Sequence, residues 1–236
     1  MRRFFIAVAL VALLVAPAEA QSGDRVVRTL SEDFPRADYE GVAFELSVGE
    51  IEVTGASADT ITAEVRIRCN RGRDQERCEK RAQAVELASY DRRGRLYLEV
   101  EGTGYWRSRD ATVHVILTIP EDMPAQLDIG TGELTVANLA SDLTIDMSIG
   151  ELTLDNVSGN VTVDMGIGEI NVTMPQDAVG EVTLDNGVGE TELRHRDGRN
   201  AVEGILGGTD VHWNSGSGPS SVSIELNVGE ILVRLK

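Results

Sequence analysis

Residues 143–154 read LTIDMSIGELTL, and residues 161–172 repeat the phrase as VTVDMGIGEINV. In both segments apolar and polar residues alternate, which is typical of a strand with one buried face. Each segment then carries an apolar-Gly-Glu triplet, after which the apolar residues resume one position out of phase. We predict a corner at this glycine, because a residue without a side chain permits a bend. The residues predicted to face inward in the first segment are Leu143, Ile145, Met147, Ile149, Leu152 and Leu154.

The same template occurs six times. Its glutamates are Glu50, Glu133, Glu151, Glu169, Glu190 and Glu230, with intervals of 18, 18 and 21 residues in the middle. We interpret the final interval of 40 as two turns, with a degenerate copy at residues 205–213. A period of this size is typical of a solenoid. The sequence therefore predicts an all-β, single-chain parallel β-solenoid with coils of 18–21 residues. Asn138 and Asn156 occupy equivalent positions in consecutive copies, at the second corner of each coil, where we predict a stacked amide ladder.

Residues 60–120 depart from the repeat. Residues 60–68, 96–101 and 112–119 have strand patterns, whereas residues 74–90 have helical character before a stop at Gly94. We interpret 60–120 as an insertion with one helix that covers the N-terminal end of the solenoid. The predicted organisation is then a lead-in at 21–40 and a solenoid domain at 41–236, with regular coils from 125 to 236.

The first residues resemble an export signal. Arg2 and Arg3 precede an apolar run at 4–16 that is too short to cross a bilayer, and Ala18-Glu19-Ala20 is a small-x-small cleavage site. We predict a signal peptide at 1–20 and export to the periplasm, cell surface or medium, and we expect no membrane span. In an oxidising compartment, Cys69 and Cys78 are predicted to form a disulfide.

The charge is strongly acidic. The full chain has a formal net charge of −17, and no Lys or Arg occurs from residue 111 to residue 193. Such a surface disfavours nucleic acid and anionic lipid, and it suits cations or a basic partner. The basic stretch within residues 66–81 contrasts with this surface. We interpret it as a solvated helix face, and head-to-tail self-association is the alternative.

Two rows of carboxylates are the candidate metal site. Each template glutamate follows another acidic residue by five positions, and neighbouring coils lie about 4.8 Å apart. Rows of carboxylates offer the oxygen ligands that calcium accepts. No other cofactor is expected. The alternative is that the acids bond to corner N–H groups and keep the sheet soluble. The candidate calcium ligands are Asp146, Glu151, Asp164 and Glu169.

An aromatic and basic loop is the candidate partner-binding site, because exposed aromatic side chains bind sugar faces or proteins. The alternative is that its aromatic side chains cover the end of the solenoid. The three histidines, including His114, are interpreted as scattered surface residues. The candidate binding residues are Tyr105, Trp106, Arg107 and Arg109.

Three segments give the chain a family resemblance: FELSVGEIEVTG at 44–55, GRLYLEVEG at 94–102 and VILTIPEDMPAQLDIGTGELTV at 115–136. They resemble the bacterial DUF4097 family, whose members are described as adhesins with a β-solenoid. The resemblance covers residues 40–236 and implies no catalytic residues. It favours an exported, non-enzymatic binding or structural protein that contacts a surface glycan or a protein partner. The alternatives are a carbohydrate-active β-helix enzyme and a calcium-stabilised scaffold.

Overall fold

The computed structural model of the chain describes residues 25–69, 75–103, 111–204, 208–214 and 218–236. The predicted signal peptide at 1–20 lies outside the described residues. The all-β prediction is confirmed. The strands are β1 (Arg25–Pro35), β2 (Gly41–Ala56), β3 (Thr60–Cys69), β4 (Glu86–Arg92), β5 (Arg95–Glu101), β6 (Ala111–Pro120), β7 (Ala125–Ala137), β8 (Leu143–Asp155), β9 (Val161–Met174), β10 (Val179–His195), β11 (Gly198–Gly204), β12 (Thr209–Asn214) and β13 (Ser220–Leu235). The helices are α1 (Gln75–Ala82) and two single 3-10 turns, η1 (Arg36–Asp38) and η2 (Gln176–Ala178).

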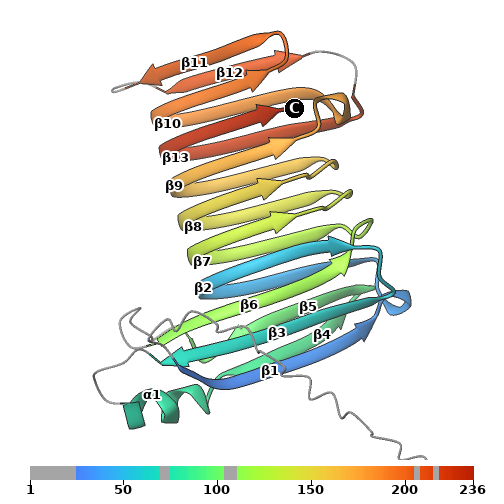
Figure 1. The fold of residues 1–236 in the computed structure, drawn as a ribbon, viewed down its shortest axis with the longest axis vertical. Coiled ribbons are helices and arrows are strands. Elements are labelled where there is room, and N and C mark those ends of the chain that lie inside the picture. Colours follow the sequence, from blue (N-terminus) through green and yellow to red (C-terminus); the bar gives the residue numbers. More distant parts are fainter. Residues whose placement is uncertain (1–24, 70–74, 104–110, 205–207, 215–217) are drawn as a thin grey trace, which may run out of the picture.

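The strands form one large sheet whose central part is parallel. Its order is β1-β3-β6-β2-β7-β8-β9-β13-β10-β11, with β4, β5 and β12 joined at the sides. In the regular part, β7, β8 and β9 pair in parallel at a constant offset, so that Asp146 lies beside Asp128 and Asp164. Figure 1 shows these strands as a ladder along the long axis of the molecule.

Each template copy is one long strand that bends, rather than two separate strands. β8 runs without interruption through Gly150, and Figure 1 shows the bends of the ladder along one side. The residues before and after the bend point into one aliphatic core, as predicted. Ile149 was predicted to face inward, and this is wrong: its side chain is 47% exposed. The chain turns between Met147 and Leu152, which leaves Ile149 on the outer side of the bend.

The opposite side of the ladder carries the predicted amide ladder. Asn138 and Asn156 both have left-handed backbone, with φ of 57° and 55°, which asparagine tolerates better than most residues. The Asn156 Nδ2 donates a hydrogen bond of 2.8 Å to the Asn138 Oδ1. The prediction of an amide ladder is therefore confirmed for this pair.

The C-terminal end differs from the prediction. β13 inserts between β9 and β10 and pairs with both in parallel. β12 and β11 instead pair antiparallel with the first and second halves of β10. The predicted degenerate coil at 205–213 is therefore wrong for its described part, residues 208–213. The physical reason is the template: β13 has the full apolar pattern with its Gly-Glu, whereas β12 lacks the glycine that the bend requires.

At the N-terminal end of the sheet, the two halves of one bent strand pair with two different strands. The first half of β2 pairs with β5, and its second half pairs with β6. The predicted helix over 74–90 is wrong beyond Ala82, because residues 86–92 form β4 and pair with β5. Arg93 and Gly94, with φ of 57° and 81°, make the tight turn between these strands. Among the described residues, no helix has the length and apolarity that a membrane crossing requires.

The predicted disulfide is present. Cys69 at the end of β3 is joined to Cys78 in α1, with Cα atoms 6.1 Å apart. Both cysteines are buried, and Ala111 packs against them. The bond therefore fastens α1 to the sheet.

Candidate functional site

The bends of six strands are stacked in register, and we call this side of the molecule the bend edge. Its glycines pair in the order Gly49, Gly132, Gly150, Gly168, Gly229 and Gly189. Segments that lie far apart in the sequence therefore present the same triplet at neighbouring positions.

Glycine is required at these bends because neighbouring backbones almost touch. Gly150 has a φ of 149°, and a Cβ added there would lie 1.8 Å from the carbonyl oxygen of Gly132. A Cβ at Gly168 would meet the Gly150 oxygen at the same distance. The glycines thus form a strip of bare backbone along the bend edge.

Beside this strip runs a column of apolar side chains in contact with solvent. On four consecutive strands the residue before the glycine is apolar and exposed: 47% for Ile149, 50% for Ile167, and 43% for both Val228 and Val188. These four stack in register on consecutive strands, and we call them the apolar column. Within the described part of the chain they are four of the six large apolar residues that are exposed. Apolar surface concentrated in this way marks an interaction site more often than scattered residues do.

Two rows of carboxylates flank the apolar column. Asp146 precedes Ile149 by three residues in the first half of β8, and Glu151 follows Ile149 by two residues in the second half. The first acidic row is Glu99, Glu45, Asp128, Asp146, Asp164, Glu225, Asp185 and Asp210, in register on eight strands. The second acidic row is Glu50, Glu133, Glu151, Glu169, Glu230 and Glu190.

The candidate calcium ligands lie in these rows, as the repeat predicts. Asp146 is beside Asp164 in the first row, and Glu151 is beside Glu169 in the second. In the part of the chain that the structure describes, no group of three or more His, Cys, Asp or Glu side chains is arranged to hold a metal ion. The calcium hypothesis stays a prediction.

The carboxylates of the first acidic row interact unfavourably with one another. Partial burial, followed by the charges of Asp128 and Asp164, raises the pKa of Asp146 above its ordinary value. At the other end of the row, partial burial and the charges of Glu99 and Asp128 raise the pKa of Glu45. The row therefore carries negative charge that the fold itself does not neutralise.

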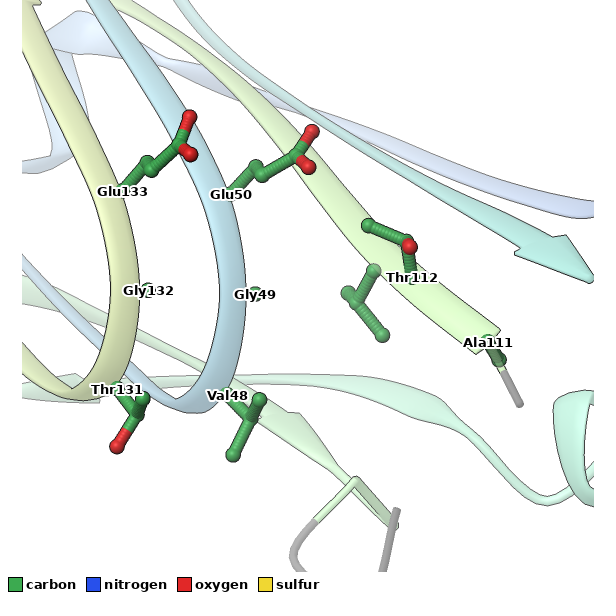
Figure 2. A pocket seen from close by; sticks show the side chains of 9 residues that line it. Val48, Gly49, Glu50, Ala111, Thr112, Thr131, Gly132 and Glu133 are labelled. Atoms are coloured by element: carbon green, nitrogen blue, oxygen red, sulfur yellow. The ribbon is translucent and has the colours of Figure 1, made fainter. Parts of the chain in front are cut away.

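A hollow of about 310 Å³ lies at the N-terminal end of the bend edge. It forms where β6 begins and pairs with the second half of β2 alone. Figure 2 shows the carboxylates of Glu50 and Glu133 side by side above the two glycines, and Val48 and Thr131 below them. The hollow thus has carboxylates on one side and an apolar group on the other. This combination suits the side chain of Lys or Arg, which carries a positive charge at the end of an apolar stem. The lining residues are Val48, Gly49, Glu50, Ala111, Thr112, Val113, Thr131, Gly132 and Glu133.

Residues 21–194 match the family model described as the N-terminal domain of toast_rack, DUF2154. The chain belongs to this family. A relation of this toast_rack domain to DUF4097 stays a resemblance based on the three segments quoted above. No curated protein matches the sequence.

A solved structure with a TM-score above 0.5 shares the fold of this toast_rack domain. A provisionally named cell adhesion protein from Clostridium sporogenes is 18% identical, with a TM-score of 0.61, and the match covers 89% of this chain and 99% of that one. Two provisionally named adhesins, from Parabacteroides distasonis and Parabacteroides merdae, are each 12% identical, with TM-scores of 0.29 and 0.30. They cover 88% and 89% of this chain and 97% of their own. At these identities the first similarity shows the fold alone, and the other two carry no argument.

Other sequence-based expectations for the toast_rack domain have mixed outcomes. The candidate binding residues Tyr105, Trp106, Arg107 and Arg109 lie outside the described residues.

His114 was interpreted as a surface histidine, and this is wrong: its side chain is 10% exposed, and its Nε2 lies 3.2 Å from a Glu52 carboxylate oxygen. The apolar column was missed, although its signal was visible in the sequence. The change of phase at each bend requires a residue that belongs to neither buried face.

The first acidic row gives a testable pH dependence. A raised pKa means that folded Asp146 binds its proton more tightly than the unfolded chain, so this residue lowers stability at pH 7. The penalty disappears as the pH falls through the raised pKa toward the ordinary value of 3.8. We therefore expect Asp146→Asn to stabilise the protein at pH 7 by about 0.2–1 kcal/mol and to have no effect near pH 3.5.

Urea unfolding at both pH values measures this difference. Asp91→Asn, an exposed aspartate on β4 outside the row, is the matched control and should change stability at neither pH. Destabilisation by Asp146→Asn at pH 7 would contradict the argument, because it would mean that the charge is favourable in the folded protein.

Proposed function

We propose that the mature chain is an exported, non-enzymatic binding protein that contacts a cell-surface component through its outer surface. The observation that carries this proposal is the apolar column, a continuous apolar surface that the core does not use. The disulfide and the start of the family match at residue 21, where we expect the mature chain to begin, support export. The similarity to a provisionally named cell adhesion protein supports the binding role.

The finer description of the fold is part of the proposal. We infer a β-solenoid in which each bent strand, with the loop that follows it, is one coil. The constant register of β7, β8 and β9 supports one coil per template copy in this region. A flat solenoid with few projecting loops presents long outer faces, which suit contact with an extended partner better than enclosure of a small substrate.

Binding to intact cells tests the function. The mature chain, residues 21–236, is labelled with a fluorophore and titrated onto cells of the source bacterium. We expect saturable binding that unlabelled protein competes away. Protease treatment of the cells removes a protein partner, and periodate treatment removes a glycan, so the two treatments distinguish these partners. Heat-unfolded protein is the control, and binding that is absent or does not saturate would contradict the proposal.

One observation bears on the alternative that the protein is a carbohydrate-active enzyme. A hollow at the other side of the molecule combines Arg36 with three acidic residues, Asp59, Glu121 and Asp122. The Arg36 Nη2 already pairs with Asp122 at 2.8 Å, and the Asp122 side chain is 67% exposed. An exposed ion pair of this kind is usual on protein surfaces. Release of reducing sugar from acidic polysaccharides, lost in Asp122→Asn, would favour the enzyme instead.

A further inference from the structure

We propose that the bend edge is a docking surface for a basic amphipathic helix of a partner protein. The apolar stripe of that helix would lie on the apolar column, and its flanking Lys and Arg side chains would reach the two acidic rows. This inference rests on the proposed function and specifies the surface and the chemistry of the partner.

The fold does not require apolar residues in this column. Thr131 occupies the same register position on β7, between Val48 and Ile149, and it is exposed as Ile149 is. A polar side chain is therefore compatible with the bend. Ile149, Ile167, Val228 and Val188 nevertheless place branched apolar groups in solvent on four consecutive strands. Exposed apolar groups weaken solubility, and burial against a partner would make them favourable.

The charge around the column selects the partner. Acidic residues border it on both sides, and no Lys or Arg occurs from residue 111 to residue 193. Among the described residues, Glu133, Glu151, Glu169 and Glu230 of the second row form no ion pair. A partner with cations on both sides of an apolar stripe would satisfy these carboxylates, whereas an acidic partner or an anionic membrane would be repelled.

The spacing of the column fits a helix. Four strands at about 4.8 Å place the outermost apolar residues about 14 Å apart. A helix rises about 5.4 Å per turn, so residues recurring once per turn meet successive strands along roughly three turns. The bare glycine strip beside the column leaves room for the backbone of the helix to approach. Binding of this type uses apolar anchors at helical spacing, with charges that fix orientation.

A defined peptide tests the docking surface. The probe is an 18-residue peptide of Leu and Lys whose helix has a leucine stripe flanked by lysines, and fluorescence anisotropy reports its binding in 150 mM NaCl. We expect Ile149→Thr/Ile167→Thr/Val228→Thr to weaken binding at least tenfold. Val26→Thr is the control and should change affinity less than twofold, since Val26 is 43% exposed outside the column. Threonine is compatible with the column, so the variants should keep the melting temperature of the wild type.

A second set of variants tests whether peptide binding requires the carboxylates of the second acidic row. We expect Glu151→Gln/Glu169→Gln/Glu230→Gln to weaken peptide binding at least tenfold and to reduce its dependence on salt. Glu76→Gln/Glu79→Gln/Glu86→Gln removes the same charge from exposed positions elsewhere and should leave binding within twofold. A peptide with Ser in place of Leu should bind at least tenfold more weakly. Equal binding of the Leu and Ser peptides would overturn the proposal, because it would show attraction by charge alone.

Other occupants give different results. Binding to phosphatidylglycerol vesicles that the apolar-column variant loses, without peptide binding, would replace the proposal with a lipid surface. Dimerisation in sedimentation that the same variant abolishes, again without peptide binding, would replace it with a second copy of this chain. If the variant binds source cells as the wild type does, the docking surface is wrong while the proposed function stands. If no protein binds cells saturably, the proposed function fails independently of the peptide result.

Discussion

Replacement of Gly150 by alanine is expected to destabilise the protein by more than about 4 kcal/mol, a cost that few single substitutions reach. The added Cβ would lie 1.8 Å from the carbonyl oxygen of Gly132 and 2.5 Å from the Cε of Met147. The methionine side chain can move, but the Gly132 oxygen belongs to the backbone of a paired strand. Relief would require β7 and β8 to separate at the bend, with loss of their hydrogen bonds and of core packing on both sides of the bend.

Urea unfolding followed by circular dichroism measures this cost. Gly94→Ala is the matched control, because Gly94 also has positive φ, at 81°, but its nearest neighbours are Glu40 side-chain atoms at 3.8 Å or more. Alanine there carries the cost of the left-handed backbone alone, about 1–2 kcal/mol. We expect the Gly150 variant to be clearly less stable than the Gly94 variant or to lose its cooperative transition. Equal costs at the two positions would show that close approach of the backbones is not what selects glycine at the bend.

Much of the fold could be predicted because the same pattern of alternating apolar residues and Gly-Glu occurs six times in the sequence. The alternation of Leu143, Ile145 and Met147 with polar residues predicts strands, and the recurring glycine predicts the bend. The change of phase at the bend indicated that a residue lies outside both buried faces, but the alternation itself did not identify Ile149 as that residue, because it assigns each side chain to one of only two directions. The placement of β13 between β9 and β10 was equally hidden. Pairing there follows the match between template copies rather than order along the chain.

The same reasoning explains the outcome for the candidate site. The acidic rows follow directly from the spacing of Glu151 and Glu169, since stacked repeats place equivalent residues side by side. The apolar column depends on side-chain direction at the bend, which the spacing does not determine. The end of α1 at Ala82 depends on pairing between β4 and β5, which helical propensity does not show. Strand pairing thus decided the end of α1 and the place of β13, whereas the local geometry of the bend decided the apolar column.

Removal of the disulfide is expected to lower stability by about 2–3 kcal/mol, the loop-closure value for two cysteines nine positions apart. The largest local effect should be on α1. This helix has eight residues, of which Cys78 and Ala82 are buried, and isolated helices shorter than about 12 residues are marginal in water. Besides the disulfide, the Arg28 Nη1 donates a hydrogen bond of 2.8 Å to the Ala82 carbonyl oxygen. Such a hydrogen bond contributes about 1 kcal/mol, less than the value expected for the disulfide.

Hydrogen exchange of the Cys69→Ser/Cys78→Ser variant locates the effect. We expect amides of α1 to lose protection while those of β7, β8 and β9 keep it, because the ladder has its own core. Reduced wild-type protein is the control for the two serine hydroxyls and should behave like the variant. Unchanged protection in α1 would show that its packing on β1 and β3 is sufficient without the bond. The expected result instead makes this end of the molecule dependent on an oxidising compartment, which the proposed export supplies.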